Sequence, residues 1–451
     1  MKKSKLFGIV LGICIVGMIA GCSQGSNPET KISEASEIVS EEVVEIGSAE
    51  SESEEEITTE IQASVTDDVK ELKFSIPLPM GGMLQSVEFQ EVEGISDDKK
   101  SEMDRAARAG TPSSGLVINN AKNFYYYSKL SSDIQNIYDA MLLLAQDPSS
   151  EDNVVVMMTA DDPTSSEFLD KYATAYFALV YDHPELFWLY NESETSVALA
   201  TPKSESGSLH TVYLFFSNPV KDFEKQQKAF NKAADDFLSD INLKGSEREV
   251  AKAIHDKLIN MVTYDMDTLA LSPEESRASL SHTAYGALVE NNKGEKNHAV
   301  CDGYSLAYVY LLQQAGIDAV FIGGTAGYSK SETEGHAWSM VSLDGKWHEV
   351  DSTWDDMGTM DDSLEEAKGA DGYEYLVEAL ADKEYREILQ HYLWGVSTGE
   401  ISSFSPSEDY LYYTKDGKYA LCLLAPSVHV RDNKKTAGPM GEVVDLAPIA
   451  K

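Results

Sequence analysis

The sequence feature that most constrains the fold is a pair of alternating segments around Asp344-Gly345. Residues 335–343 and 346–354 read GHAWSMVSL and KWHEVDSTW, and each alternates apolar with polar or small side chains. Asp-Gly between two such segments favours a two-residue β-hairpin loop, because both loop positions need a positive φ. The pattern therefore predicts an antiparallel hairpin in which Leu343 pairs with Lys346.

This register places an imidazole beside a carboxylate. Trp338 falls opposite Asp351, and residues two apart on a strand share a face, so His336 and Asp351 become diagonal neighbours. A carboxylate next to a histidine orients the ring, as in the Ser-His-Asp triad. His348 falls on the opposite face, and Glu349 lies opposite Met340, farther from His336. The hairpin thus predicts His336 and Asp351 as a functional pair.

Upstream of the hairpin, a cysteine stands at the start of an apolar segment. Residues 297–316 read NHAVCDGYSLAYVYLLQQAG, which predicts a buried helix with Gly316 as its C-terminal cap. Cys301 would lie at the N-terminal end of this helix. The unpaired N–H groups and the helix dipole there should lower the pKa of its thiol, which favours a nucleophile.

Four segments resemble the bacterial transglutaminase-like superfamily: AYGALVE at 284–290, AVCDGYS at 299–305, GHAW at 335–338 and DGKWHEVDSTWDD at 344–356. A looser similarity extends over about 120–400. The resemblance implies a papain-like α+β fold, with a helical N-terminal half packed against an antiparallel sheet. It also implies a triad of Cys301 as nucleophile, His336 as base and acid, and Asp351 as orienting carboxylate.

The resemblance implies acyl transfer through a thioester, ending in protein crosslinking or in hydrolysis of a peptide or isopeptide amide. The backbone N–H of Cys301 and the side chain of Tyr285 are candidate donors to the oxyanion. Trp338 and Trp354 would wall the thioester from water. Packing in the core is the alternative for all three aromatic side chains. A non-catalytic cell-surface binding module with the same fold is the alternative function, and an adhesion or scaffold role is a third.

The N-terminus predicts export and lipid attachment. Three lysines precede the apolar residues 6–20, a segment shorter than the roughly 20 residues of a membrane-spanning helix and typical of a signal peptide. The sequence Ile19-Ala20-Gly21-Cys22 resembles a bacterial lipobox, which implies cleavage before Cys22 and acylation of its thiol. An uncleaved signal anchor is the alternative. The expected location is the extracytoplasmic face of a bacterial membrane.

Composition divides the rest of the chain. Residues 22–72 are rich in acidic residues and serine and hold no aromatic residue, so we expect a disordered tether. We further expect a mostly helical region at 73–245, a catalytic core at 246–400, and a β-hairpin followed by a frayed tail at 401–451. The expected helices include one that starts at Asn218-Pro219. Asp355-Asp356 is expected to form a solvated turn.

The charge and cysteine content limit the partners. A net charge of −40 in 451 residues disfavours nucleic-acid binding, because phosphates would be repelled. Four cysteines cannot form a disulfide scaffold, and the nine histidines show no metal-ligand spacing, so we expect neither a metal nor another cofactor. The expected partner is a protein or peptide substrate, for example a cell-wall peptide. The oligomeric state does not follow from the sequence.

Overall fold

The computed structural model describes two groups of residues, one in each half of the chain. In the N-terminal half these are 69–74, 89–92, 124–146, 148–149, 153–190, 197–202 and 208–216. The second group comprises 220–272, 275–276, 278–356, 358, 374–417 and 420–451. The predicted signal peptide, the lipobox with Cys22 and the tether up to residue 68 lie outside the described residues. Residues 69–72, which we assigned to the tether, begin a strand instead.

A five-stranded antiparallel sheet lies in the N-terminal half, together with the helices that were expected there. Its order is β2-β1-β4-β5-β3. The strands are β1 (Val69–Phe74), β2 (Phe89–Val92), β3 (Val154–Thr159), β4 (Val197–Pro202) and β5 (His210–Phe216). Because side chains alternate across a strand, β4 and β5 bury Leu199 and Leu214 on one face and Ala200 and Tyr213 on the other.

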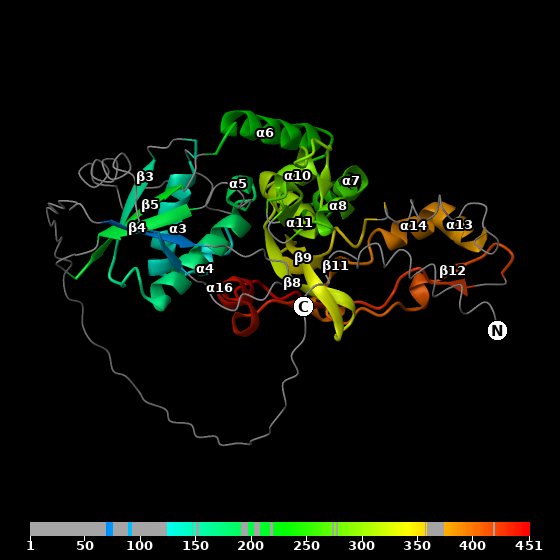
Figure 1. Cartoon of the computed structure of the whole chain (residues 1–451). Helices are drawn as coiled ribbons and strands as arrows, with labels where there is room; N and C mark the ends of the chain where they lie inside the picture. Colours follow the sequence, from blue (N-terminus) through cyan, green and yellow to red (C-terminus); the bar gives the residue numbers. More distant parts are fainter. Residues whose placement is uncertain are drawn as a thin grey trace, which may run out of the picture.

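Two amphipathic helices accompany this sheet. They are α3 (Ser132–Ala145), which packs against β3 and β5, and α4 (Ser166–Asp182), which packs against α3. The short helices η1 (Tyr127–Lys129) and α5 (Phe187–Tyr190) flank α4. In Figure 1 these elements form the left-hand part of the molecule.

A second five-stranded sheet forms the centre of the molecule, in the order β11-β10-β9-β8-β14. Its strands are β8 (Ala319–Ser329), β9 (Glu332–Leu343), β10 (Lys346–Val350), β11 (Trp394–Val396) and β14 (Val428–Arg431). The predicted hairpin is confirmed, since Leu343 pairs with Lys346 and Met340 with Glu349. Asp344 and Gly345 have φ values of 52° and 74°, as the two-residue loop requires.

The central helix α11 (Cys301–Gln314) packs against β9 and β8, and its residues 301–312 are all buried. Helix α7 (Glu247–Met261) covers α11 and begins with a capping box formed by Ser246 and Glu249. Around them lie α6 (Phe223–Ser239), β6 (Thr263–Tyr264), α8 (Met266–Leu269), η2 (Leu280–His282), α10 (Ala284–Leu288) and β7 (His298–Ala299). Helix α6 starts at Phe223, not at Pro219 as predicted, with Asp222 at its N-cap.

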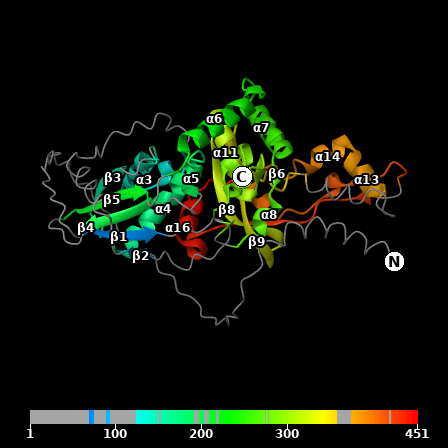
Figure 2. The same ribbon diagram turned by 45° about the horizontal axis from the view of Figure 1, so that its top comes forward.

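The C-terminal residues complete the molecule. The remaining elements are α13 (Glu374–Ala381), α14 (Lys383–Leu389), α15 (Thr398–Ile401), η3 (Glu408–Tyr410), β12 (Tyr412–Tyr413), β13 (Ala420–Leu421) and α16 (Lys434–Asp445). The predicted frayed tail is wrong: α16 buries Met440, Val443 and Val444 and packs against α4. Figures 1 and 2 both show α16, in red, between α4 and the central sheet.

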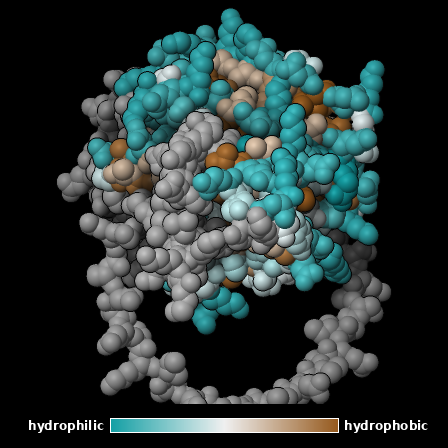
Figure 3. Space-filling model, turned by 90° about the vertical axis from the view of Figure 1, so that its right-hand side faces the viewer, coloured by the Kyte–Doolittle hydropathy of each residue, from teal (hydrophilic) through white to brown (hydrophobic). Residues whose placement is uncertain are grey.

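The mixture of helices and antiparallel sheets is the α+β class expected from the sequence. Hydrophilic side chains cover most of the described surface on the face seen in Figure 3. Within the part of the chain that the structure describes, none of the helices has the length and hydropathy of a membrane span.

Candidate functional site

Cys301 is the first residue of α11 and is 2% exposed. The extended residue Val300 precedes it, and the Val300 N–H donates to the Ser281 carbonyl at 2.9 Å, which anchors the start of the helix. A β-carbon added at Gly303 would come within 2.4 Å of that same carbonyl oxygen. The close approach of η2 therefore fixes the first turn of α11 and with it the position of the thiol.

The thiol of Cys301 lies against the strand that carries His336. The backbone N–H groups of Ala337 and Asp302 donate to its sulfur. Ala337 directly follows His336 on β9, so the thiol contacts the residue next to the predicted base.

His336 and Asp351 form the predicted pair. Nε2 of His336 lies 2.7 Å from Oδ2 of Asp351, and both side chains are buried. Asp351 follows the last residue of β10, so the hairpin supplies both groups. A carboxylate oxygen is an acceptor, so Nε2 carries the proton. Nδ1 is then the ring nitrogen that is free of a proton and can act as a base.

Asp351 accepts hydrogen bonds on both oxygens. The backbone N–H groups of Thr353 and Trp354 donate to Oδ1 at 3.0 and 3.1 Å. Oδ2 accepts a second imidazole, because Nε2 of His429 lies 2.8 Å away. Burial alone would raise the pKa of Asp351, but His336 and the donors around it hold that pKa well below its ordinary range. The carboxylate is therefore ionised whenever the protein is folded near neutral pH.

The pKa of Cys301 moves opposite to our expectation. Burial raises it well above its ordinary value, and the negative charge of Asp302 adds to the effect. The N–H donors of Ala337 and Asp302 lower the pKa, but they do not compensate for the loss of water. In the resting structure Cys301 is thus a thiol, which needs a base to become a nucleophile.

The structure places Trp338 and Trp354 beside His336 but Tyr285 in the core. The rings of Trp338 and Trp354 lie 6.1 and 5.8 Å from the His336 ring, and the indole N–H of Trp338 donates to Glu349. Tyr285 packs against Phe187, with ring centroids 4.6 Å apart. The arrangement of Tyr285 matches the packing alternative.

Comparisons with known proteins agree with this architecture. Residues 235–352 match the model of the transglutaminase-like superfamily. The chain contains a transglutaminase-like domain. The match covers α7, α11 and the hairpin, and it holds all three residues of the Cys301, His336 and Asp351 site.

Individual relatives are distant. Kyphoscoliosis peptidase of Mus musculus is 27% identical over 135 residues, which cover 28% of this chain and 18% of that protein. The Homo sapiens protein of the same name is 27% identical over 148 residues, which cover 30% and 21%. The chain thus spans about a fifth of the length of these relatives. A solved structure titled "Crystal structure of a TGase" shares 19% identity, with a TM-score of 0.23, and covers 37% of this chain and 46% of that one.

A second buried pair lies behind Cys301 in the transglutaminase-like domain. Nδ1 of His282 lies 2.9 and 2.8 Å from the two oxygens of Asp302, and both side chains are buried. Nε2 of His282 lies 3.0 Å from the hydroxyl of Ser276. Because Asp302 follows Cys301 directly, the contact between His282 and Asp302 helps to hold the first turn of α11, which positions the thiol.

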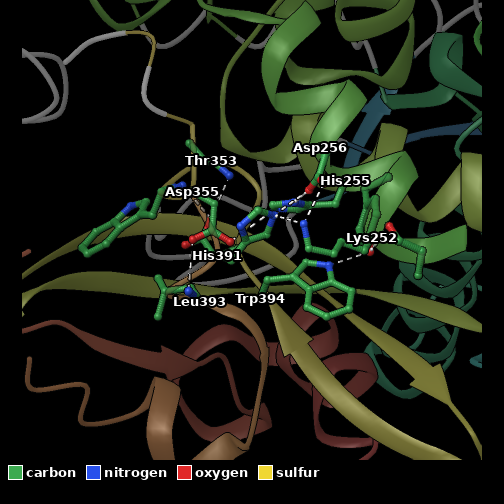
Figure 4. Close-up of polar contacts among 12 residues, drawn as sticks. Lys252, His255, Asp256, Thr353, Asp355, His391, Leu393 and Trp394 are labelled. Atoms are coloured by element: carbon green, nitrogen blue, oxygen red, sulfur yellow. Dashed lines mark hydrogen bonds and ion pairs between the residues drawn. The ribbon is translucent and has the colours of Figure 1, made fainter. Parts of the chain in front are cut away.

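A charged cluster, shown in Figure 4, supports the loop after Asp351. Asp355 is fully buried, so the prediction of a solvated turn is wrong at this position. Its Oδ1 accepts the Leu393 N–H at 3.0 Å, while the Asp351 N–H donates to the Leu393 carbonyl at 3.2 Å. Its Oδ2 lies 3.2 Å from Nε2 of His255 on α7. Burial raises the pKa of Asp355 to about 6.

Among the described residues, two groups of side chains have the composition of a metal site. In the first, formed by His255, Asp256 and His391, the Lys252 ammonium lies 2.8 Å from Asp256 and 2.9 Å from His391. This ammonium already supplies a cation. In the second, formed by Asp351 with His336 and His429, the 2.7 and 2.8 Å separations are those of hydrogen bonds. Both groups are thus explained as hydrogen-bonded clusters.

Sequence reasoning missed His429, His282 and His255. Each contacts a residue that is distant in the sequence: His429 is 78 residues from Asp351, His282 is 20 residues from Asp302, and His255 lies on α7, far from Asp355. No local spacing marks such pairs. The only usable signal is that these histidines lie in segments with an apolar pattern, where an unpaired imidazole is costly to bury.

Proposed function

We propose that this protein is a cysteine-dependent acyl-transfer enzyme that acts on amide groups of proteins or peptides. The observation that carries the proposal is the single continuous arrangement of a buried thiol, an imidazole and an ionised carboxylate on α11 and the β9–β10 hairpin. The name of the relatives, a peptidase, supports amide chemistry in general.

The mechanism follows from the protonation states. His336 Nδ1 takes the proton of Cys301 as the sulfur attacks the amide carbonyl, and a tetrahedral oxyanion forms. The backbone N–H of Cys301, at the N-terminal end of α11, is the candidate donor that would stabilise this oxyanion. His336 then gives its proton to the leaving amine, and a thioester remains on Cys301.

An acceptor completes the reaction. A primary amine or water loses a proton to His336 and attacks the thioester, which releases Cys301 and returns the proton to the sulfur. Asp351 stabilises the imidazolium that exists between these steps. A lysine acceptor gives a crosslink, and water gives hydrolysis.

The test uses the purified full chain in detergent with an unstructured protein substrate and a fluorescent primary amine. Ammonia release, amine incorporation and peptide-bond cleavage are measured together, with Cys301→Ala and His336→Ala as controls. Ammonia with incorporated amine indicates crosslinking, ammonia without it indicates deamidation, and new peptide termini indicate proteolysis. Equal signals from wild type and Cys301→Ala on every readout would refute the enzyme proposal.

The deep burial of Cys301 favours a second candidate, a non-catalytic surface module that retains the fold. In this case the chain binds the unstructured protein or a cell-wall peptide without changing it. Binding that is equally strong in wild type and Cys301→Ala, together with no product, would select this function.

We also propose that the chain is exported and anchored by lipid on Cys22, at the extracytoplasmic face of a bacterial membrane. The apolar segment at 6–20 and the Ile19-Ala20-Gly21-Cys22 sequence support this. Expression in a bacterial host should give a membrane-bound protein whose N-terminal peptide starts at Cys22 with an added acyl mass. A Cys22→Ala variant that keeps the same membrane attachment would contradict the proposal.

A further inference from the structure

His429 is a buried histidine from the C-terminal part of the chain that reaches the candidate site. It lies on β14, which pairs with β8 so that His429 is opposite Ala326. Its side chain is fully buried, and its Nε2 lies 2.8 Å from Oδ2 of Asp351. Strand β14 falls outside the residues that match the transglutaminase-like model, which end at 352.

The protonation state of His429 follows from its surroundings. Nε2 faces a carboxylate oxygen and must donate, whereas Nδ1 is buried and has no hydrogen-bond partner among the residues that the structure describes. A bare lone pair is the cheaper state for such an unpartnered nitrogen, so the ring is neutral with its proton on Nε2.

The charges near His429 agree with a neutral ring. Burial lowers the pKa of His429, and the charge of His336 lowers it further, while Asp351 and Glu349 act in the opposite direction. Arg431, two residues further along β14, is ion-paired with Glu349. His429 therefore keeps its single proton, whereas His336 is the ring that exchanges a proton in the proposed reaction.

Oδ2 of Asp351 is consequently shared by two imidazoles with different states. The backbone N–H groups of Thr353 and Trp354 hold Oδ1 in place, but they do not determine the position of Oδ2, which can still move by rotation of the carboxylate. The second donor on Oδ2 restrains this rotation. The ring centroids of His336 and His429 are 5.5 Å apart, so both rings approach the oxygen from different directions.

We propose that His429 is a positioning residue whose hydrogen bond to Asp351 keeps the carboxylate aligned with His336, so that Nδ1 of His336 faces Cys301. The inference rests on the proposed acyl-transfer function. His429 acts only through Asp351 and does not contact the thiol or the substrate.

The test measures alkylation of Cys301 by iodoacetamide as a function of pH. It uses the full chain in detergent with Cys14, Cys22 and Cys422 replaced by serine, so that Cys301 is the reactive thiol. His429→Phe removes the donor, whereas His429→Gln keeps an N–H at a similar distance from the backbone. Val430→Thr is the matched control, because Val430 is the neighbouring residue on β14 and is 46% exposed.

We expect His429→Phe to lower the rate at pH 7 about tenfold, since ten-fold corresponds to about 1.4 kcal/mol, the scale of one hydrogen bond to a charged group. The acid limb of the pH profile should move to higher pH, because a carboxylate that loses a donor becomes more basic and holds the His336 proton more tightly. His429→Gln should restore most of the rate, and Val430→Thr should behave as wild type.

A wild-type pH profile in His429→Phe would overturn the inference, and so would equal losses in His429→Phe and His429→Gln. His336→Ala separates this result from failure of the proposed function: an unchanged profile in His336→Ala means that no Cys–His pair is assembled at all. If the buried thiol reacts in no variant, the downfield proton resonance of the His336–Asp351 hydrogen bond is compared instead. It should change in His429→Phe and persist in His429→Gln, and an unchanged resonance in both refutes the inference.

Discussion

Replacement of Asp351 by asparagine tests the candidate site most directly, because the two side chains have the same shape. The carboxylate accepts four hydrogen bonds, two on each oxygen. Asparagine can keep its oxygen toward the Thr353 and Trp354 N–H groups. Its NH₂ group then faces Nε2 of His336 and Nε2 of His429. Because an NH₂ group only donates, both Nε2 atoms must become acceptors. Both rings must move their proton to Nδ1, and in His336 this proton points at Cys301.

The magnitude follows from the contacts. Each imidazole–carboxylate hydrogen bond contributes about 1.5–3 kcal/mol. Loss of the two imidazole hydrogen bonds to Oδ2 should therefore reduce the free energy of unfolding by about 3–6 kcal/mol. Any new hydrogen bond that the asparagine NH₂ group makes would reduce this loss. The activity should fall far more, because His336 cannot accept a proton on a nitrogen that already has one. A wrong tautomer in the Ser-His-Asp triad costs about 10⁴-fold, and we expect the same order here.

Two measurements check Asp351→Asn. Denaturant unfolding gives the change in free energy, and the Cys301-dependent signal of the acyl-transfer assay gives the change in rate. Wild type should also lose stability as the pH falls below about 4, because the depressed pKa of Asp351 stabilises the folded state only while the group is ionised. Asp351→Asn should lack this contribution. A variant that folds and retains more than about a tenth of the wild-type rate would refute the assigned role of Asp351.

Three further predictions concern the supports of the site. Gly324→Ala should destabilise the protein by about 1–3 kcal/mol, because an added β-carbon would lie 2.2 Å from the Val430 carbonyl oxygen. Thermal or chemical unfolding measures this change, and unchanged stability would contradict the close packing of β14 against β8. Glu349→Gln should cost about 3–5 kcal/mol in the same assay, since it leaves the partly buried Arg431 without its charge partner, and a neutral effect would mean that this ion pair contributes nothing. The buried Asp182 has its pKa raised by burial to about 7, so its proton stays bound in the folded state after the unfolded chain has lost it near pH 4. Wild type should therefore lose about 4 kcal/mol relative to Asp182→Asn between pH 4 and 7, and parallel pH profiles of the two proteins would refute this.

Local pattern explains why so much of the central region could be predicted. Asp344-Gly345 has one favourable conformation between two strands, so the loop determines the register, and the register determines which side chains share a face. The contact between His336 and Asp351 needs nothing else. The helix after Cys301 and the capping box at Ser246 are likewise determined within a few residues.

Burial is the property that local pattern could not supply. The pKa of Cys301 was expected to fall from its place at a helix end, yet its enclosure by β9 and η2 raises it. The same reason applies to Asp355, whose neighbours in the sequence indicate a turn but whose partner His255 comes from α7. Desolvation depends on everything that surrounds a group, and most of that is distant in the sequence.

The sequence by itself determined the hairpin with its register and the pairing of His336 with Asp351, because both rest on steric rules that act between near neighbours. The α+β class followed from the resemblance to a known family. Tertiary structure alone decided that the C-terminal residues are not a loose end: β14 completes the central sheet, α16 packs against α4, and His429 joins Asp351. These contacts join segments whose individual patterns are weak, and only the burial gained when they pack together selects them.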